Sequence, residues 1–200
     1  MELALLGALP PARVDSVTAT WLRDPKRAGV ARHALSWWAQ RRDTAALRQF
    51  GERALTARGD TAMRARRWLV YDTTALAAYR ALMRRDTVAA LQRFAVLSDT
   101  LCEGCFLDRL NEARLLAGRG RGGLARADTV LRQRLFTTLT LTEHLLAVEH
   151  AEVASQLGHA DDARRSAASV VAAWATGEPA VQPYVQRARR VLASLGGAKR

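Results

Sequence analysis

The stretch that decides the fold is AEVASQLGHADDA, residues 151–163. An alanine stands at each end, Ala151 and Ala163, and Leu157-Gly158 lies between them. Glycine favours the left-handed backbone conformation at which helices end, and Asp161-Asp162 puts negative charge where a following helix begins. The stretch therefore predicts two helices joined by a tight turn, with a small residue on each helix where the two cross.

The same spacing of small residues occurs in three earlier parts of the chain. The four pairs are Ala34 with Ala46, Ala78 with Ala90, Ala113 with Ala125, and Ala151 with Ala163. Successive pairs are 44, 35 and 38 residues apart. Steps of this length are typical of a stack of helical hairpins, in which each hairpin buries its apolar faces against its neighbours.

Two segments also resemble each other directly, RRDTAALRQF at 41–50 and RRDTVAALQRF at 84–94, with one residue inserted in the second. We expect Asp43 and Asp86 to cap the helices that follow them, because an aspartate side chain accepts hydrogen bonds from exposed first-turn amides. Asp60 also precedes threonine, and Asp24 precedes Pro25, a residue suited to a first helical turn.

Strand patterns are nearly absent, whereas Ala, Leu and Arg, which favour helix, are abundant. Helices are predicted near 11–23, 26–41, 44–58, 61–84, 87–98, 106–118, 122–135, 142–157, 160–175 and 183–195. The prediction is an all-α fold in a single domain over 1–200. Its hairpins lie at about 26–58, 61–98, 106–135 and 142–175, with a leading helix and a closing helix at 183–195.

These units resemble tetratricopeptide repeats, which are helix–turn–helix hairpins of about 34 residues. The fourth unit carries the best match and closes with Val170; aromatic residues follow the second small residue in the first two units, at Phe50 and Phe94. The first two units depart from the pattern because they lack glycine at the turn, and the third has Thr129 where an aromatic is expected. The resemblance covers about residues 27–175 and implies an α-α superhelix, or solenoid.

A narrower resemblance links the stretch 86–116 and the tail 170–185 to the C-terminal helical repeats of large bacterial signalling proteins. In that group the repeats follow a serine/threonine kinase or a transcriptional-regulator domain. The likeness implies that this chain is a fragment of a longer one, and the apolar start Met1–Leu9 fits a helix cut off from a parent chain. Kinase motifs are missing from the sequence, so the kinase activity is not carried over.

No catalytic residue, metal site or cofactor is expected. Cys102 and Cys105 form the only C-x-x-C, and the histidines show no metal-ligand spacing to it, so we interpret the thiols as small hydrophobes in a turn. The sequence GRGRGG at 118–123 has dinucleotide-motif spacing, but it follows a predicted helix instead of a strand, which favours a turn. Asp161-Asp162 beside His159 is interpreted as a helix start.

The chain is strongly basic, with a formal net charge of +12 and a sequence pI of about 11.2. Nucleic-acid binding needs the basic residues to gather on one surface. Here the arginines are spread along the whole chain and are not interleaved with stacking aromatics. The distribution of arginines thus disfavours nucleic-acid binding, but because of the high net charge a basic helical nucleic-acid-binding protein is kept as the alternative function.

The leading functional prediction is a non-catalytic scaffold that binds a peptide or a helix of a partner protein in a concave groove. The chain could also be the regulatory appendage of a signalling protein. First helices of the hairpins should line the groove, and the candidate partner-binding residues are Leu35, Trp38, Asp72, Tyr79, Arg114 and Glu152. Burial of Trp38 and Tyr79 in the core is the competing interpretation.

The expected location is the cytoplasm, or outside it if the parent chain is membrane-anchored. Met1–Leu9 is too short to cross a bilayer and lacks the positively charged start of a secretory signal. The oligomeric state and the identity of the partner stay open.

Overall fold

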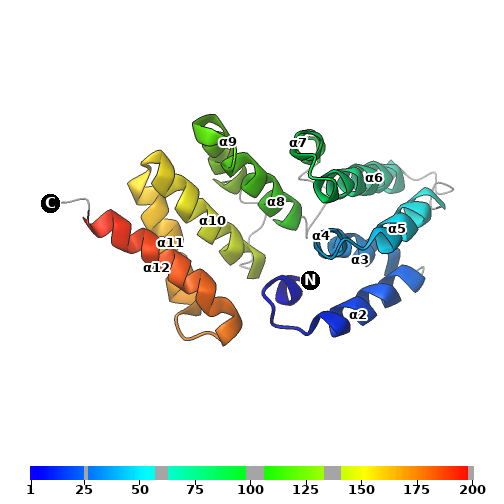
Figure 1. Ribbon diagram of the computed structural model, residues 1–200, viewed down its shortest axis with the longest axis horizontal. Helices are drawn as coiled ribbons and strands as arrows, with labels where there is room; N and C mark the ends of the chain where they lie inside the picture. Colours follow the sequence, from blue (N-terminus) through cyan, green and yellow to red (C-terminus); the bar gives the residue numbers. More distant parts are fainter. Residues whose placement is uncertain (25–26, 57–62, 98–105, 133–140, 198–200) are drawn as a thin grey trace. The chain divides into compact units, whose positions relative to one another are not determined.

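A computed structural model describes residues 1–24, 27–56, 63–97, 106–132 and 141–197 of the 200-residue chain. Within these ranges every regular element is a helix (Figure 1), so the predicted all-α class is confirmed. The chain divides into two compact units, Met1–Asp108 and Arg109–Arg200, and each is described by itself. The single domain expected over 1–200 stays a prediction.

Unit 1 contains two helical hairpins, which follow a short helix and a longer one. Its elements are α1 (Glu2–Leu5), α2 (Pro11–Arg23), α3 (Ala28–Ala31), η2 (Arg32–Ala34), α4 (Leu35–Gln40), α5 (Thr44–Thr56), α6 (Met63–Met83), α7 (Thr87–Phe94) and the start of α8 (Phe106–Ala117). The long helix α6 packs against α4, α5 and α7. The single helix expected over 26–41 is instead divided by the 3-10 turn η2, at whose end Ala34 has φ −88° and ψ −5°.

Unit 2 holds the remainder of α8, followed by a further set of helices. These are α9 (Gly120–Arg132), α10 (Leu141–Leu157), α11 (Ala160–Trp174), η4 (Pro179–Val181) and α12 (Gln182–Gly197). Helices α10, α11 and α12 lie side by side (Figure 1). In both units the first helix after a hairpin contacts both helices of that hairpin, since α6 packs on α4 and α5, and α12 packs on α10 and α11.

Three of the turns inside hairpins share one geometry. The chain takes a left-handed backbone conformation at Arg42 (φ 55°), Arg85 (φ 60°) and Gly158 (φ 82°). The next residue then donates its amide back into the helix, in the bonds Asp43 to Trp38 (2.8 Å), Asp86 to Ala81 (3.0 Å) and His159 to Ala154 (2.9 Å). The turns of the first two hairpins therefore adopt the conformation that glycine favours, although they contain no glycine. This left-handed conformation destabilises the folded chain by about 1 kcal/mol at each of the two arginines.

The predicted aspartate caps are present in both hairpins of unit 1. The Asp43 carboxylate accepts the amide of Ala46 at 2.9 Å, and the Asp86 carboxylate accepts the amide of Ala89 at 3.0 Å. Each cap satisfies an amide that has no partner inside the helix, which stabilises the helix start by about 1 kcal/mol. Pro25 and Asp60 lie outside the described residues.

The small residues predicted at hairpin crossings are buried in seven of the eight positions, and the exception is Ala125, which is exposed. Only Gly118 and Arg119 separate α8 from α9, so α9 begins earlier than predicted. Gly123 takes the crossing position instead, and a Cβ built on it would lie 2.1 Å from the Leu116 carbonyl oxygen. The pairing of Ala113 with Ala125 was wrong because the turn is shorter than in the other hairpins.

Candidate functional site

In unit 2 a network of charged side chains joins three helices, and we call it the unit 2 network. It consists of Arg114 on α8, Glu149 and Glu152 on α10, and Arg187 on α12. Arg114 donates to Glu149 at 2.8 and 3.0 Å, and Arg187 lies 3.0 Å from the same carboxylate. Arg187 also donates two hydrogen bonds to Glu152, at 2.8 and 2.7 Å.

The four side chains remain partly open to solvent, at 41% for Arg114, 14% for Glu149, 32% for Glu152 and 24% for Arg187. The hydrogen bond to Glu152 is the largest of the causes that raise the pKa of Arg187, so this guanidinium stays charged at every physiological pH. Ion pairs this exposed add at most about 1 kcal/mol to stability. The network therefore fixes the positions of charged groups on an accessible surface more than it holds the fold together.

Unit 1 has a more buried polar cluster between α6, η2 and the start of α8, which we call the unit 1 cluster. Arg32 forms a two-pronged ion pair with Asp72, at 2.8 and 3.1 Å, and its guanidinium lies 3.8 Å from the centre of the Trp68 ring. The hydroxyls of Tyr71 and Tyr79 both donate to Asp108, at 2.6 and 2.5 Å.

Burial raises the pKa of the Asp108 carboxyl to about 6, because loss of solvent outweighs the two tyrosine hydrogen bonds that favour its charged form. Burial also raises the pKa of Asp72, although the hydrogen bond and the charge of Arg32 oppose it. Asp72 and Asp108 repel each other as well. The unit 1 cluster thus holds two carboxylates with raised pKa, Asp72 bound by Arg32 and Asp108 bound by two tyrosine hydroxyls.

A second polar cluster in unit 2 brings together a serine, a histidine and an aspartate from three helices. The imidazole of His150 on α10 lies 2.8 Å from the Ser166 hydroxyl through Nδ1 and 3.0 Å from Asp128 through Nε2. Asp128 on α9 also pairs with Arg132 at 2.9 Å, and Arg132 reaches Asp162 on α11. A neutral imidazole satisfies both contacts, with Nε2–H donating to Asp128 and Nδ1 accepting from Ser166.

These contacts have the order of a Ser–His–Asp relay, but acyl transfer also needs donors for a developing oxyanion. Ser166 lies in the interior of α11, so its own amide and that of Ala167 bond to carbonyls one turn earlier in the helix. Neither amide is available to an oxyanion. The contacts of His150 with Ser166 and Asp128 link α9, α10 and α11.

We expect His150 to titrate below the ordinary histidine value near 6.5, because burial lowers its pKa more than Asp128 raises it. The Asp128→Asn substitution should lower the pKa of His150 further, since it removes the carboxylate that favours the imidazolium. Titration of the ring proton by NMR measures both values. A higher pKa in the variant would contradict this account. Since the folded state prefers neutral His150, acidification below about pH 6.5 should weaken unit 2.

The six residues predicted for partner binding fall into two groups. Leu35, Trp38 and Tyr79 are buried, with exposed fractions of 2%, 2% and 1%. The expected exposure of Leu35 on an inner face was wrong, and for Trp38 and Tyr79 the competing interpretation, burial in the core, holds. Their helices pack on neighbours with the same faces that carry these side chains. Trp38 also donates to Thr18 at 3.3 Å, and Tyr79 stacks edge-on against Phe94.

The other three residues belong to the polar groups described above. Asp72 is buried in its pair with Arg32, whereas Arg114 and Glu152 are both members of the unit 2 network. Sequence reasoning missed Arg32, Glu149 and Arg187. The sequence did contain a signal for these contacts, namely the spacing between residues of opposite charge. Arg32 and Asp72 are 40 residues apart, and the pairs Arg114 with Glu149 and Glu152 with Arg187 are each 35 residues apart. These separations are about one hairpin.

Part of the positive charge is paired with carboxylates of the same chain. Besides the arginines already named, Arg109 pairs with Glu112 at 2.7 Å, Arg164 pairs with Asp161 at 2.8 Å, and Arg165 pairs with Asp162. Asp161 and Asp162 lie in the first turn of α11, so their interpretation as a helix start is confirmed. Their pairing with arginines was not predicted. Side chains held in this way offer little continuous positive surface to a phosphate backbone.

The structure does not describe Cys102 and Cys105, so their interpretation as turn residues lies outside the described ranges. Among the side chains that are described, no three His, Cys, Asp or Glu residues gather as a metal site would require. A search of the described helices finds none with the length and apolarity that a membrane span needs. Comparison with protein-family models, with curated proteins and with solved structures finds no match to this chain.

Proposed function

We propose that this chain is a non-catalytic protein-interaction module made of tetratricopeptide-like hairpins. A peptide or a helix of the partner binds along the first helices of the hairpins, in the trough of an α-α superhelix. The unit 2 network carries this proposal, because it places partly exposed Arg114, Glu149, Glu152 and Arg187 across three helices of one unit.

Two features support an interaction surface at this position. Arginine is among the residues that most often dominate binding energy, and here each arginine is already oriented by a carboxylate on a neighbouring helix. Ordered side chains lose little entropy when a partner binds. The carboxylates in turn can accept hydrogen bonds from the amides of an extended peptide or from its basic side chains.

The hairpin architecture supports the class of protein. Small residues are buried at Ala34, Ala78, Ala90, Ala151 and Ala163, and each following first helix packs on the whole preceding hairpin within its unit. Stacks of this kind keep one side of each first helix free of the next hairpin, and they serve many partners by varying that side. The same surface would serve a regulatory appendage of a signalling protein.

A photo-reactive amino acid placed at Glu152 tests the proposal in the native cell. We expect covalent adducts with a partner protein after irradiation, because Glu152 lies on the proposed face. Ala168 is the matched control, since it is exposed on α11, the second helix of the same hairpin. Adducts that form equally at both positions, or only at Ala168, would place the binding surface elsewhere.

A further inference from the structure

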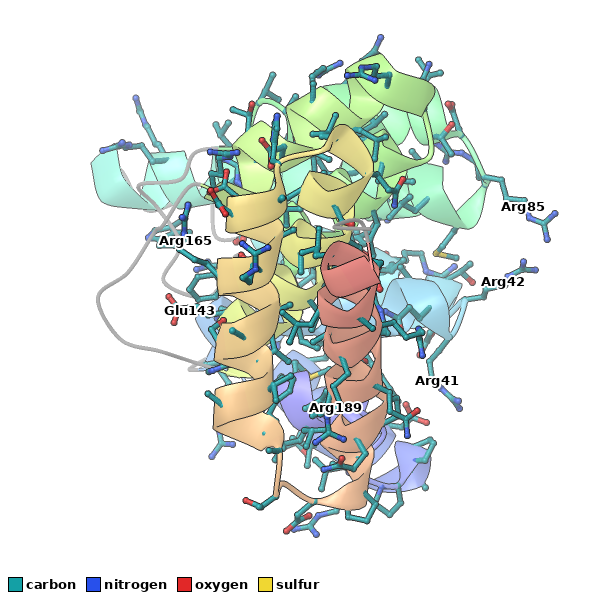
Figure 2. All side chains as sticks on the ribbon, turned by 90° about the vertical axis from the view of Figure 1, so that its left-hand side faces the viewer. Arg41, Arg42, Arg85, Glu143, Arg165 and Arg189 are labelled. Atoms are coloured by element: carbon teal, nitrogen blue, oxygen red, sulfur yellow. The ribbon has the colours of Figure 1, made fainter. Side chains whose placement is uncertain are left out.

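Unit 1 carries a second charged surface that the unit 1 cluster does not include. We call it the arginine edge, and it consists of Arg41, Arg42, Arg84 and Arg85 in the two turns of its hairpins. Figure 2 shows Arg41, Arg42 and Arg85 projecting from the same side, away from the helices. Arg42, Arg84 and Arg85 are exposed and have no side-chain partner among the described residues.

The two turns lie at the same end of unit 1. Near the end of α6, Arg80 donates to the carbonyl of Leu47 at 3.3 Å, and Leu47 is in the first turn of α5. The last turn of α6 therefore lies beside the turn that joins α4 to α5. Since packed helices are about 8–10 Å apart, the two arginine pairs lie within the length of a short peptide.

The backbone conformation of the turns does not explain the arginines at positions 42 and 85. Arg42 and Arg85 both adopt positive φ, a conformation that favours glycine, and Gly158 occupies the equivalent position in unit 2. The chain thus uses glycine in one such turn and arginine in two others. Residues held in an unfavourable backbone conformation are often those whose side chains act in binding.

We propose that the arginine edge binds an acidic segment of a polypeptide, rich in Asp and Glu, at a surface separate from the proposed first-helix face. Guanidinium groups match carboxylates through paired hydrogen bonds, and this chain already contains such pairs in Arg32 with Asp72 and Arg187 with Glu152.

One observation favours a polypeptide over a single-stranded nucleic acid. The nearby aromatic rings of Trp37 and Trp38 are buried, which leaves no described stacking platform for bases at this edge.

The test uses the double variant Arg42→Gly and Arg85→Gly, in which glycine suits the backbone and folding is preserved. Binding of a fluorescent poly-glutamate peptide to the full chain, measured by anisotropy, should weaken by about tenfold. The matched control is Arg13→Ala with Arg93→Ala, which removes the same charge from exposed positions of unit 1 and should change affinity by less than about twofold.

The thermal midpoint of the glycine variant should equal or exceed that of the wild type. An equal loss of affinity in both double variants would show a non-specific charge effect and overturn the proposal. Tighter binding of single-stranded DNA, or of phosphatidylserine vesicles, with the same dependence on Arg42 and Arg85 would also overturn it. Failure at this edge leaves the cross-linking result at Glu152 unaffected, so the two proposals can be judged separately.

Discussion

Replacing Gly123 with alanine should lower the free energy of unfolding by about 3 kcal/mol. The added Cβ would lie 2.1 Å from the Leu116 carbonyl oxygen and 2.8 Å from the Arg119 Cβ. Backbone atoms cannot rotate away as a side chain does, so α8 and α9 must separate to admit the methyl group. Urea unfolding monitored by circular dichroism measures the change.

Gly122→Ala is the matched control, because nothing lies within 4 Å of a Cβ built at that position. Both glycines belong to α9, so alanine improves helix propensity equally at each. We expect Gly122→Ala to stabilise the protein by about 0.5–1 kcal/mol. If Gly123→Ala were as benign as Gly122→Ala, the close crossing of α8 and α9 would be contradicted.

The second large effect is a loss of stability in unit 1 as pH rises through about 6. The Asp108 carboxyl has its pKa raised from 3.8 to about 6 in the folded state. Between these values the folded state holds a proton that the unfolded state has lost, so stability is greatest below the unfolded pKa and falls as the folded carboxyl ionises. A shift of this size corresponds to about 3 kcal/mol over the whole titration.

The Asp108→Asn variant removes this titration and keeps a side chain that can accept from a tyrosine hydroxyl. Urea unfolding gives the free energy of unfolding of the variant minus that of the wild type at each pH. We expect this difference to rise by about 1.5 kcal/mol as the pH is raised from about 5 to about 8, because only the wild type loses the contribution of protonated Asp108. Glu152→Gln is a suitable control, because it changes a partly exposed carboxylate in unit 2. A difference that stays constant with pH would show that Asp108 is not the responsible group.

Local signals in the sequence were sufficient to predict most helices. Aspartate followed by threonine correctly marked the starts of α5 and α7, because the cap is a contact between residues three positions apart. Leu157-Gly158 correctly marked the turn between α10 and α11. The absence of glycine at Arg42 and Arg85 was interpreted as a departure, although the backbone there has the same conformation as at Gly158.

The candidate site was less predictable, because its contacts link residues about one hairpin apart. Helical periodicity shows that Trp38 and Tyr79 lie on apolar faces, but it does not show which neighbouring helix covers them. Exposure and burial therefore both remained open for these two rings until the structure showed them buried. Ser166, His150 and Asp128 come from three different helices, and no local motif joins them. Only the packing of α9, α10 and α11 brings them together.

We propose that a partner polypeptide binds along the first helices of unit 2. Once cross-linking at Glu152 has identified the partner, amide hydrogen exchange of the full chain with and without it gives the most direct test. The account predicts slower exchange in α8, α10 and α12, the helices that carry Arg114, Glu149 and Arg187. Protection confined to α9 and α11, with α8, α10 and α12 unchanged, would contradict it.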